Sequence, residues 1–567
     1  MPANAQLARI FREMAAVLEL TGASGFRVNA YARAARVMSD LTVDVALLAD
    51  RKSLLAIDGI GDGTAKKIIQ YLDTGAVQEH QELLEEIPHG LLEVLKIPGL
   101  GPRSVRILWK QGGVTDVASL TRSLETGELE KLPRMGAKTI SNIRDSIAFV
   151  ASSKGRTRLG EALPLAERIV EFLEAVDGAT RIQYAGSLRR GCETIGDIDI
   201  LASTTRPGVL HRAFQGMPGV IKVLVAGETR SSVRLEPGIQ VDLRVVEPAS
   251  FGAALLYFTG SREHNVALRE RAIRMKLHLN EYGLTGDEPV AATTEAEVYA
   301  ALGLPYIPPE LREVRGELDL TETPPLIELG DIRSELHAHT IASDGHQTIE
   351  ELARCAIARG YHTIAVTDHS PSSGQANGLS PDRLLEHIDA IKAADAKIPE
   401  ITILAGAEVD ILADGHLDYD DDHLARLDVV IASPHSALRQ DADAATTRLL
   451  AALRHPLVHV LGHPTGRLIN SRQGLQPDLA RLIEAAVEHG TALEINANSR
   501  RLDLRDTHVR AAVEAGALIA VNTDVHRAEN FDELRYGIMT ARRGWLRPEQ
   551  CVNTWSSRKL LEWLRNR

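Results

Sequence analysis

Residues 186–200 read GSLRRGCETIGDIDI, a glycine-containing turn followed by a short strand that carries two carboxylates. Asp197 and Asp199 are two positions apart on that strand, so their side chains project from the same face. The Gly-Ser pair that opens the turn can present backbone N–H groups and the Ser187 hydroxyl to a phosphate. Arg190 adds a guanidinium suited to bidentate phosphate contact. The stretch therefore predicts a phosphate-binding turn beside a pair of carboxylates.

A second strand-like run, IQVDLRVV at 239–246, supplies a third carboxylate, Asp242. Three carboxylates on two adjacent strands can hold two Mg²⁺ or Mn²⁺ ions about 4 Å apart, and such a pair stabilises the attacking and leaving oxygens of phosphoryl transfer. The alternative is a solvated acidic strand edge. It agrees poorly with Asp242, which is an isolated charge within an apolar run.

Two further strings follow, YFTGSREHNVALR at 257–269 and LNEYGL at 279–284. Together with the earlier turn and DID motif they resemble the palm and thumb of a family X DNA polymerase, and the resemblance extends over residues 1 to about 320. It implies that gapped or primed DNA and a dNTP are the substrates. It also implies a catalytic metal triad, in which one member accepts the primer hydroxyl proton, together with nucleotide contacts and one template contact. The metal triad would be Asp197, Asp199 and Asp242, with Asp242 as the proton acceptor. The nucleotide contacts would be Gly186, Ser187, Arg190, Tyr257, Phe258, Gly260 and Asn265. The template contact would be Arg269.

The first 150 residues contain a recurring glycine pattern between short predicted helices. It reads IDGIGDGTAKKI at 57–68 and IPGLGPRSV at 97–105, with a degenerate copy at 132–140. A tight Gly-x-Gly hairpin at a helix N-terminus directs backbone N–H groups outward, where a phosphate can bind. The pattern resembles the helix-hairpin-helix motif, which binds the DNA backbone without reading bases. The predicted DNA contacts are Gly59, Gly61, Gly63, Lys67, Gly99, Gly101 and Arg103.

A Rossmann loop and plain helix-turn-helix packing are the alternatives to this motif. No strand precedes Gly59, and a Rossmann loop would not recur along the chain. Lys67 leaves a second question open. It occupies the position at which related animal repair polymerases carry a Schiff-base lysine, although a phosphate contact is the commoner role for a lysine there.

After about residue 331 the pattern changes to apolar strands alternating with amphipathic helices, which is typical of a βα barrel. Seven strand candidates each end in side chains that bind metals. The carboxyl ends of barrel strands meet at one rim, so these side chains should converge. Their number exceeds one tetrahedral site and indicates two or three divalent ions, Mn²⁺, Zn²⁺ or Fe²⁺. The predicted ligands are His337, His339, Asp344, His369, Glu408, His435, His463, Asp524 and His526.

The ordered strings HAH, SDG, TDH, EVD, SPH, GHP and DVH resemble the polymerase and histidinol phosphatase (PHP) family. That resemblance implies a metal-dependent phosphoesterase on a distorted (βα)7 barrel. His346 is a possible substitute ligand, and Arg467 is a candidate phosphate clamp. Eight other histidines of this segment are interpreted as structural or solvated: His362, His387, His416, His423, His455, His459, His489 and His508.

The predicted fold class is therefore multidomain. An α-helical helix-hairpin-helix region comes first, then an α+β nucleotidyltransferase palm and thumb, then the PHP barrel. The expected divisions are a lyase-like helical domain at 1–85, fingers at 86–155, palm at 156–250, thumb at 251–316, linker at 317–332 and barrel at 333–567.

Composition agrees with a globular chain of several domains. The net charge of −13 argues weakly against nucleic-acid binding, but 15 of the 20 histidines lie after residue 330, beside many acids. We therefore interpret part of the acidity as metal ligands. Three cysteines cannot crosslink 567 residues, and no apolar run approaches the ~20 residues of a membrane span. We expect a cytoplasmic monomer with no membrane association.

The expected function is DNA repair synthesis. The polymerase part would fill short gaps by template-directed nucleotidyl transfer, and the barrel would act as a 3′-5′ exonuclease or 3′-end phosphoesterase, with cleavage at abasic sites as an additional option. Two alternatives stay open: the barrel hydrolyses a small phosphate ester, or the chain is a non-catalytic DNA-end scaffold.

Overall fold

The computed structural model describes most of the chain in two compact units. One unit comprises residues 1–154 with 470–472, and the other comprises 155–469 with 473–567. The described residues are 3–40, 45–48, 51–57, 59–95, 97, 100–133, 135–137, 139–141, 143–144, 147, 155–236 and 238–566.

The first unit is helical, as predicted, and encloses its own apolar core, which includes Phe11, Met14 and Ile68. Two of its helices begin directly after glycines of the repeated pattern. Gly61 and Gly101 are the extended N-cap residues of α4 and α7. The helices are α1 (Ala3–Thr21), α2 (Gly25–Asp40), α3 (Arg51–Leu55), α4 (Asp62–Thr74), α5 (Gln78–Glu85), α6 (Leu91–Leu95), α7 (Pro102–Gly112) and α8 (Val117–Glu125), with 3₁₀ turns η1 (Val45–Leu48) and η2 (Glu128–Lys131).

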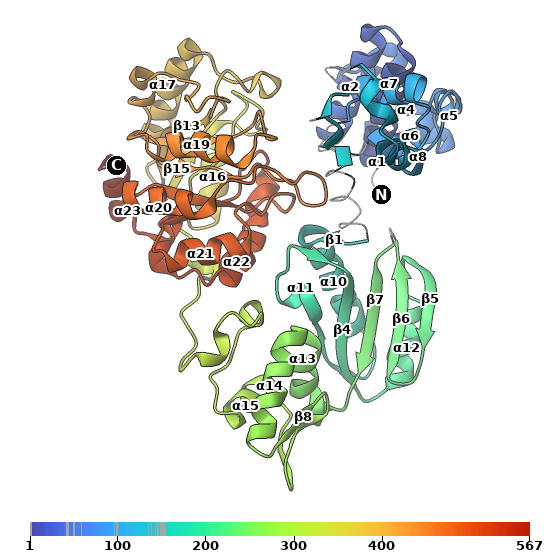
Figure 1. Cartoon of the computed structure of the whole chain (residues 1–567), viewed down its shortest axis with the longest axis vertical. Coiled ribbons are helices and arrows are strands. Elements are labelled where there is room, and N and C mark those ends of the chain that lie inside the picture. Colours follow the sequence, from blue (N-terminus) through green and yellow to red (C-terminus); the bar gives the residue numbers. More distant parts are fainter. Residues whose placement is uncertain are drawn as a thin grey trace. The chain divides into compact units, whose positions relative to one another are not determined.

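The second unit begins with a five-stranded mixed sheet in the order β2-β4-β7-β6-β5, in which only β4 and β7 are parallel. Side chains alternate between the two faces of the sheet along β4, so Asp197 and Asp199 share a face with Leu201. Ile198 and Ile200 pack with α10 and α12, whereas Leu201 faces α13 on the other side of the sheet (Figure 1). The elements are β1 (Thr157–Arg158), α10 (Leu159–Glu174), β2 (Ala179–Tyr184), α11 (Gly186–Arg189), β3 (Thr194–Ile195), β4 (Asp197–Thr204), α12 (Pro207–Gln215), β5 (Val220–Ala226), β6 (Arg230–Leu235) and β7 (Gln240–Val245).

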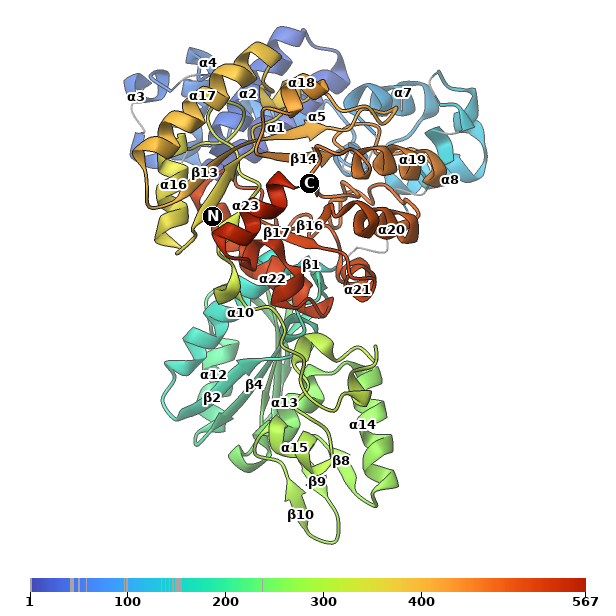
Figure 2. The same ribbon diagram turned by 90° about the vertical axis from the view of Figure 1, so that its left-hand side faces the viewer.

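A smaller helical layer with an antiparallel sheet, β10-β9-β8, follows the five-stranded sheet (Figure 2). The segment after it, predicted as a linker at 317–332, is anchored at both ends. Glu317 is fully buried against α14, and Ile327 belongs to the core of the barrel. The elements are η3 (Pro248–Ser250), α13 (Phe251–Thr259), α14 (Arg262–Arg274), β8 (His278–Asn280), β9 (Gly283–Thr285), β10 (Pro289–Ala291), α15 (Glu295–Ala301), η4 (Pro309–Leu311), η5 (Glu317–Asp319) and η6 (Leu329–Asp331).

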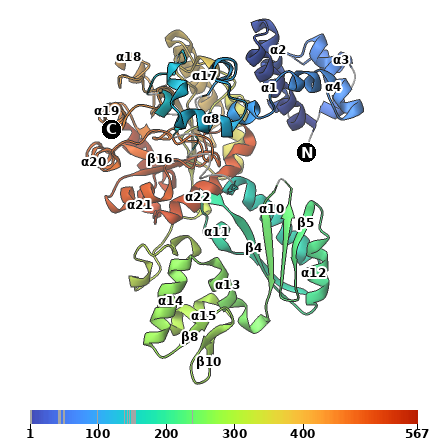
Figure 3. The ribbon, with the colours of Figure 1, turned by 45° about the vertical axis from the view of Figure 1, so that its right-hand side comes forward.

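The C-terminal part is a seven-stranded parallel sheet in sequential order, β11 to β17, which confirms the predicted (βα)7 architecture. A parallel bridge between Ala338 and Val525 joins the ends of the first and last strands, and helices surround the sheet (Figure 3). The strands are β11 (Ser334–Glu335), β12 (Thr363–Val366), β13 (Thr402–Asp410), β14 (Val429–Ser433), β15 (Val460–Leu461), β16 (Ala492–Asn496) and β17 (Ile519–Asn522). The helices are α16 (Ile349–Ala358), α17 (Pro381–Lys397), α18 (Asp421–Leu424), α19 (Ala442–Leu453), α20 (Leu479–His489), α21 (Asp506–Glu514), α22 (Leu534–Arg543) and α23 (Ser557–Arg565).

Within the described residues, none of the helices combines the length and the apolar character needed to cross a membrane.

Candidate active sites

The structure brings the three carboxylates of the palm together. Asp199 of β4 lies directly opposite Asp242 of β7, and Asp197 precedes Asp199 by two positions on the same face. Asp242 accepts hydrogen bonds from the Ser232 hydroxyl and from Gln240 Nε2 at 3.1 Å. Parallel pairing of β4 with β7 therefore produces the cluster that the spacing of the sequence predicts.

The negative charge of this cluster changes the acidity of Asp199. Burial, followed by the charges of Asp197 and Asp242, raises the pKa of its carboxyl to about 7. Three carboxylates on one face of the neighbouring strands β4 and β7 are a hard donor set of the kind that Mg²⁺ and Mn²⁺ prefer. The residues therefore fit divalent ions, which would neutralise the repulsion that raises this pKa.

The turn before β4 is shaped by a glycine. Gly186 has φ +63°, and it opens the short helix α11 directly beside Asp199. Ser187 follows it and is partly exposed. Arg190 does not extend freely from this turn. Its Nε donates to Glu313 at 3.0 Å and its Nη1 to the Thr259 carbonyl at 2.5 Å.

The predicted nucleotide contacts of the thumb lie on α13 and α14. The rings of Tyr257 and Phe258 meet edge to face at 5.1 Å. Asn265 donates from Nδ2 to the Tyr257 carbonyl at 2.7 Å, while its buried Oδ1 has no hydrogen-bond partner among the described residues. Gly260 ends α13 with φ +72°, and Arg269 donates to the Asn265 carbonyl at 3.3 Å. The amide of Asn265 is therefore only half satisfied by the described residues.

The helix-hairpin-helix glycines present open backbone. A Cβ at Gly61, Gly63 or Gly101 would meet nothing within 4 Å, whereas Gly59 has φ +85° and packs against Arg33. Gly99 lies outside the described residues.

Two basic side chains of this unit differ in exposure. Arg103 is 83% exposed and lies 3.6 Å from Glu19. Lys67 is only 17% exposed, pairs with Glu79 at 2.8 Å, and lies over the Tyr31 ring. Burial by itself would lower the pKa of Lys67, but hydrogen bonds to Glu79 and Tyr31 raise it. A Schiff-base lysine needs the opposite shift, so the surroundings of Lys67 favour a purely electrostatic role.

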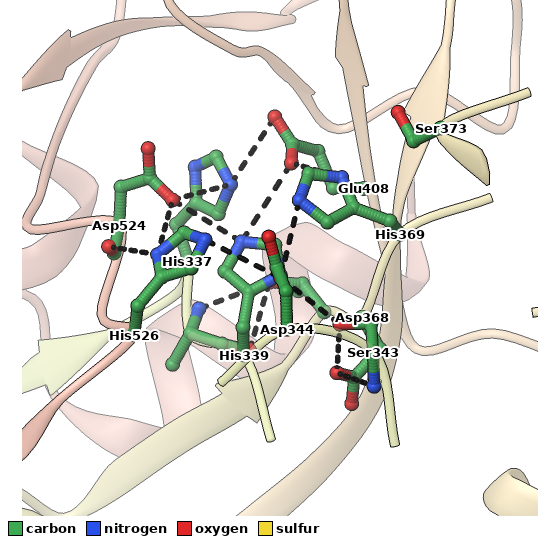
Figure 4. A network of polar contacts seen from close by, with 12 residues as sticks. His337, His339, Ser343, Asp344, Asp368, His369, Ser373, Glu408, Asp524 and His526 are labelled. Atoms are coloured by element: carbon green, nitrogen blue, oxygen red, sulfur yellow. Dashed lines mark hydrogen bonds and ion pairs between the residues drawn. The ribbon is translucent and has the colours of Figure 1, made fainter. Parts of the chain in front are cut away.

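The barrel rim gathers eight of its nine predicted ligands into three overlapping groups, whose ligand atoms lie within 4.8 Å of one another (Figure 4). The ninth, His463, contacts the same cluster through a 2.8 Å hydrogen bond between its Nε2 and Glu408. The groups are His339, Asp344, His369 and His526; His337, His339 and Asp524; and His369, Glu408 and His435.

Several buried atoms of this cluster make no hydrogen bond within the described part of the chain, which shows that the cluster suits cations. Among the described residues, His337 Nε2, both ring nitrogens of His339, and Asp524 Oδ1 have no hydrogen-bond partner although they are buried. Their polar neighbours are other members of the cluster, with His339 Nε2 3.1 Å from Asp524 Oδ1 and His337 Nε2 3.4 Å from Glu408. Buried polar atoms without hydrogen bonds are costly, and a metal ion would satisfy them. The mixed histidine and carboxylate donors suit Mn²⁺, Zn²⁺ or Fe²⁺.

The charges at the rim are strongly coupled. Burial alone would lower the pKa of His369, but Glu408 and Asp344 raise it to about 11. Burial would also lower the pKa of His435 and of His526, but nearby carboxylates outweigh it and raise both pKa values to about 9. His339 is the contrast, because burial and then its histidine neighbours lower its pKa to about 4.

A second layer of side chains orients these ligands. Glu494 accepts from His337 Nδ1 at 2.7 Å and from the His463 backbone N–H at 2.7 Å. That contact leaves His337 Nε2 directed at the cluster, as in carboxylate–histidine–metal arrangements. Asp410 contacts His435 Nδ1 at 3.1 Å. Asp368 instead accepts hydrogen bonds from Thr340, Ser343 and His387, which are not predicted ligands, so it stabilises the loop after His339 and not a ligand directly.

Two subsidiary residues lie elsewhere. The guanidinium of Arg467 pairs with Glu193 at 2.6 Å and donates to the Leu502 carbonyl, so it is engaged with the palm. The backbone N–H of His346 donates to the His526 carbonyl, and His346 is not a member of the three groups.

The comparisons with known proteins agree with this arrangement. Family models for a helix-hairpin-helix domain, a SAM-like helix-hairpin-helix tandem, the DNA polymerase beta thumb and the PHP domain match residues 2–77, 91–148, 254–313 and 335–498. The DNA polymerase/3′-5′ exonuclease PolX of Bacillus subtilis (strain 168) is 38% identical over 551 residues, covering 96% of both chains. The chain belongs to the PolX family. This membership confirms the predicted order of helix-hairpin-helix, polymerase and PHP parts.

Other relatives match a smaller part of the chain. A probable phosphatase of Caldanaerobacter subterraneus subsp. tengcongensis is 33% identical over 204 residues, which is 34% of this chain and 75% of that protein. A probable phosphatase of Edwardsiella ictaluri is 30% identical over 243 residues, which is 41% of this chain and 94% of that protein.

The buried carboxylates around the barrel ligands are not predicted from the sequence. Glu494, Asp410 and Asp368 lie within the strand-end motifs, but the motifs assign them no role. A signal was available: each is a carboxylate in or directly after an apolar strand, where a charge needs a buried partner.

Proposed function

We propose that this chain fills short DNA gaps by template-directed nucleotidyl transfer and trims 3′ ends with its PHP barrel. The observation that carries the proposal is the match to a DNA polymerase/3′-5′ exonuclease over 96% of both chains, in a molecule that assembles both carboxylate and histidine clusters. The substrates would be gapped or primed DNA and a dNTP.

In the polymerase centre, Asp197, Asp199 and Asp242 would hold Mg²⁺ or Mn²⁺. Bound ions of this type stabilise the negative charge of in-line phosphoryl transfer. Asp242 would accept the primer hydroxyl proton, and the hydrogen bonds from Ser232 and Gln240 to its carboxylate support this role. Ser187 and Arg190 would bind the β and γ phosphates.

The remaining contacts would position the substrates. Tyr257 and Phe258 would lie beside the incoming sugar, and Asn265 would contact the new base pair in its minor groove. Arg269 would contact the template strand. The open glycine hairpins at Gly61, Gly63 and Gly101, with Arg103, would bind the DNA backbone through N–H groups and charge. Gly59 would hold the first turn, and Lys67 would add positive charge.

In the barrel, the nine rim residues would hold two or three divalent ions, which polarise a phosphoester and activate water. Glu408 contacts five of the histidines, so it is the central carboxylate of the cluster. Glu494 and Asp410 would hold His337, His463 and His435 in fixed orientations, which would keep the cluster rigid when substrate enters.

A second candidate function concerns the barrel alone. Relatives named probable phosphatases match about the length of the barrel, so a small phosphate ester is an alternative substrate for it. Assay of the full chain on 3′-recessed DNA and on histidinol phosphate separates the two. Hydrolysis of the small ester with no DNA degradation would refute the exonuclease proposal.

Paired variants test the assignment of the two centres. Asp197→Ala with Asp199→Ala should abolish gap filling and leave DNA degradation intact, whereas His339→Ala should do the reverse. Matched controls are Asp177→Asn, an exposed palm carboxylate, and His416→Ala, an exposed barrel histidine. Unchanged nucleotide incorporation by the aspartate variant would exclude these carboxylates as the catalytic triad. A wild-type chain that binds gapped DNA but incorporates no nucleotide would favour a non-catalytic DNA-end scaffold.

A further inference from the structure

One carboxylate connects the predicted phosphate-binding arginine to the barrel. Glu313 Oε1 accepts from Arg190 Nε at 3.0 Å and from Arg543 Nη1 at 2.9 Å. Arg190 belongs to the turn before β4, and Arg543 is the last residue of α22 in the barrel. The two arginines therefore share a single carboxylate oxygen across the boundary between palm and barrel.

Arg543 is held firmly in this position. Its Nε and Nη2 both contact Asp506 Oδ2, at 3.1 and 2.9 Å, and only 7% of its side chain is exposed. Its Nη1 also donates to the Arg190 carbonyl at 2.8 Å. The next residue of the turn is Gly191, where an added Cβ would lie 3.0 Å from Met539 of the same barrel helix. The barrel therefore contacts the backbone of the turn at Arg190 and Gly191. It also contacts Glu313, the carboxylate that pairs with Arg190.

The cluster carries an uncompensated positive charge. Its ion pairs join three guanidinium groups, of Arg190, Arg315 and Arg543, to two carboxylates, of Glu313 and Asp506. The side chains of Arg190 and Glu313 are 14% and 17% exposed, so solvent screens the excess poorly. An anion that approached Arg190 would restore neutrality.

We propose that Arg543 is a positioning residue for the nucleotide site: by binding Glu313 it weakens the hold of that carboxylate on Arg190, so that a triphosphate can take its place. The inference rests on the proposed role of Arg190 as a phosphate contact. Glu313 is the internal competitor of the nucleotide, and it moves wholly onto Arg543 when the nucleotide binds. The barrel thereby completes the nucleotide site of the polymerase.

The alternative is that Arg543 only holds the palm against the barrel. The positioning role and this structural role predict different effects when Glu313→Gln is added to Arg543→Gln. Arg543→Gln leaves Arg190 as the principal partner of Glu313, so dNTP binding should weaken about tenfold, the value of one charge-assisted hydrogen bond. Adding Glu313→Gln removes the competitor. The double variant should therefore bind dNTP within about threefold of the wild-type chain.

The measurement is the equilibrium Kd of dNTP for the full chain on gapped DNA whose primer ends in a dideoxynucleotide. Arg535→Gln is the matched control, because Arg535 lies on the same helix and pairs with Glu167 of α10. It should change the dNTP Kd less than about twofold. Exonuclease activity, expected to be unchanged in every variant, reports an intact barrel.

Three results would overturn the inference: an Arg543→Gln variant with wild-type dNTP affinity, a double variant that binds dNTP no better than Arg543→Gln, or an equal loss in Arg535→Gln. Failure of the proposed function is distinguishable from these. It would appear as no nucleotide incorporation by the wild-type chain on an extendable primer.

Discussion

Gly186 lies so close to Asp199 that a methyl group at Gly186 would overlap the Asp199 carboxylate oxygen Oδ2. Gly186 also has φ +63°, a backbone conformation that residues with a side chain rarely adopt. The turn that would bind phosphate, at Gly186, therefore lies in direct contact with the Asp199 carboxylate, which would hold a metal. This close approach requires glycine.

Gly186→Ala should displace the Asp199 carboxylate and reduce kcat for gap filling by at least about a hundredfold, because small misplacements of reacting groups are costly. Primer extension measures the loss. Gly238→Ala is the control, since Gly238 also has positive φ, in the same domain, but open space around it. Equal losses in the two variants would show that backbone strain, and not the contact with Asp199, is responsible.

Glu494→Gln should weaken metal binding by the barrel about 10- to 100-fold, the usual effect of removing a partner that orients a ligand. The amide cannot accept equally well from both His337 Nδ1 and the His463 N–H. Titration of exonuclease activity with Mn²⁺ measures the shift, and gap filling should be unaffected. Glu484→Gln, on the exposed face of α20, is the control. A wild-type metal requirement in Glu494→Gln would refute the role of Glu494.

The placement of the carboxylates and histidines in both sites could be predicted from the sequence. Strand alternation placed Asp197 and Asp199 on one face, and the rule that parallel strands end at one rim gathered His337, His369 and Asp524. These inferences depend on local periodicity and topology. They need no knowledge of how distant side chains pack.

Contacts between distant segments could not be derived in this way. Glu494 is 157 positions from His337, and Arg543 is 230 positions from Glu313. No local pattern specifies such a pair, because each partner is an ordinary charged residue until the chain folds. Arg190 shows the consequence: its phosphate-binding role was predicted, but its pairing with Glu313 was not.

Metal binding by the barrel should strengthen as pH rises from 6 to 9. Nearby carboxylates overcome the effect of burial and raise the pKa of His369 to about 11 and of His435 and His526 to about 9. These imidazoles are protonated at neutral pH before metal binds, and each must lose a proton to become a ligand. Protons therefore compete with the metal below pH 9, and this competition fades as pH rises.

Calorimetry in two buffers of different ionisation enthalpy measures the protons released. We expect more than one proton per barrel loaded at pH 7, and fewer from His526→Ala than from the wild-type chain. His416→Ala, on an exposed loop, is the control and should release the wild-type number. Metal affinity that is constant between pH 6 and 9 would contradict the prediction.

Lys67 should not form a Schiff base with abasic DNA. Only a neutral amine attacks an aldehyde, and Glu79 and Tyr31 keep the pKa of Lys67 above its ordinary value despite partial burial. Borohydride trapping of the chain on abasic DNA should accordingly be the same for the wild type and Lys67→Ala. Glu79→Gln removes the anion that pairs with Lys67, so its pKa should fall and trapping through Lys67 should increase. Strong wild-type trapping that disappears in Lys67→Ala would instead establish Lys67 as a lyase nucleophile.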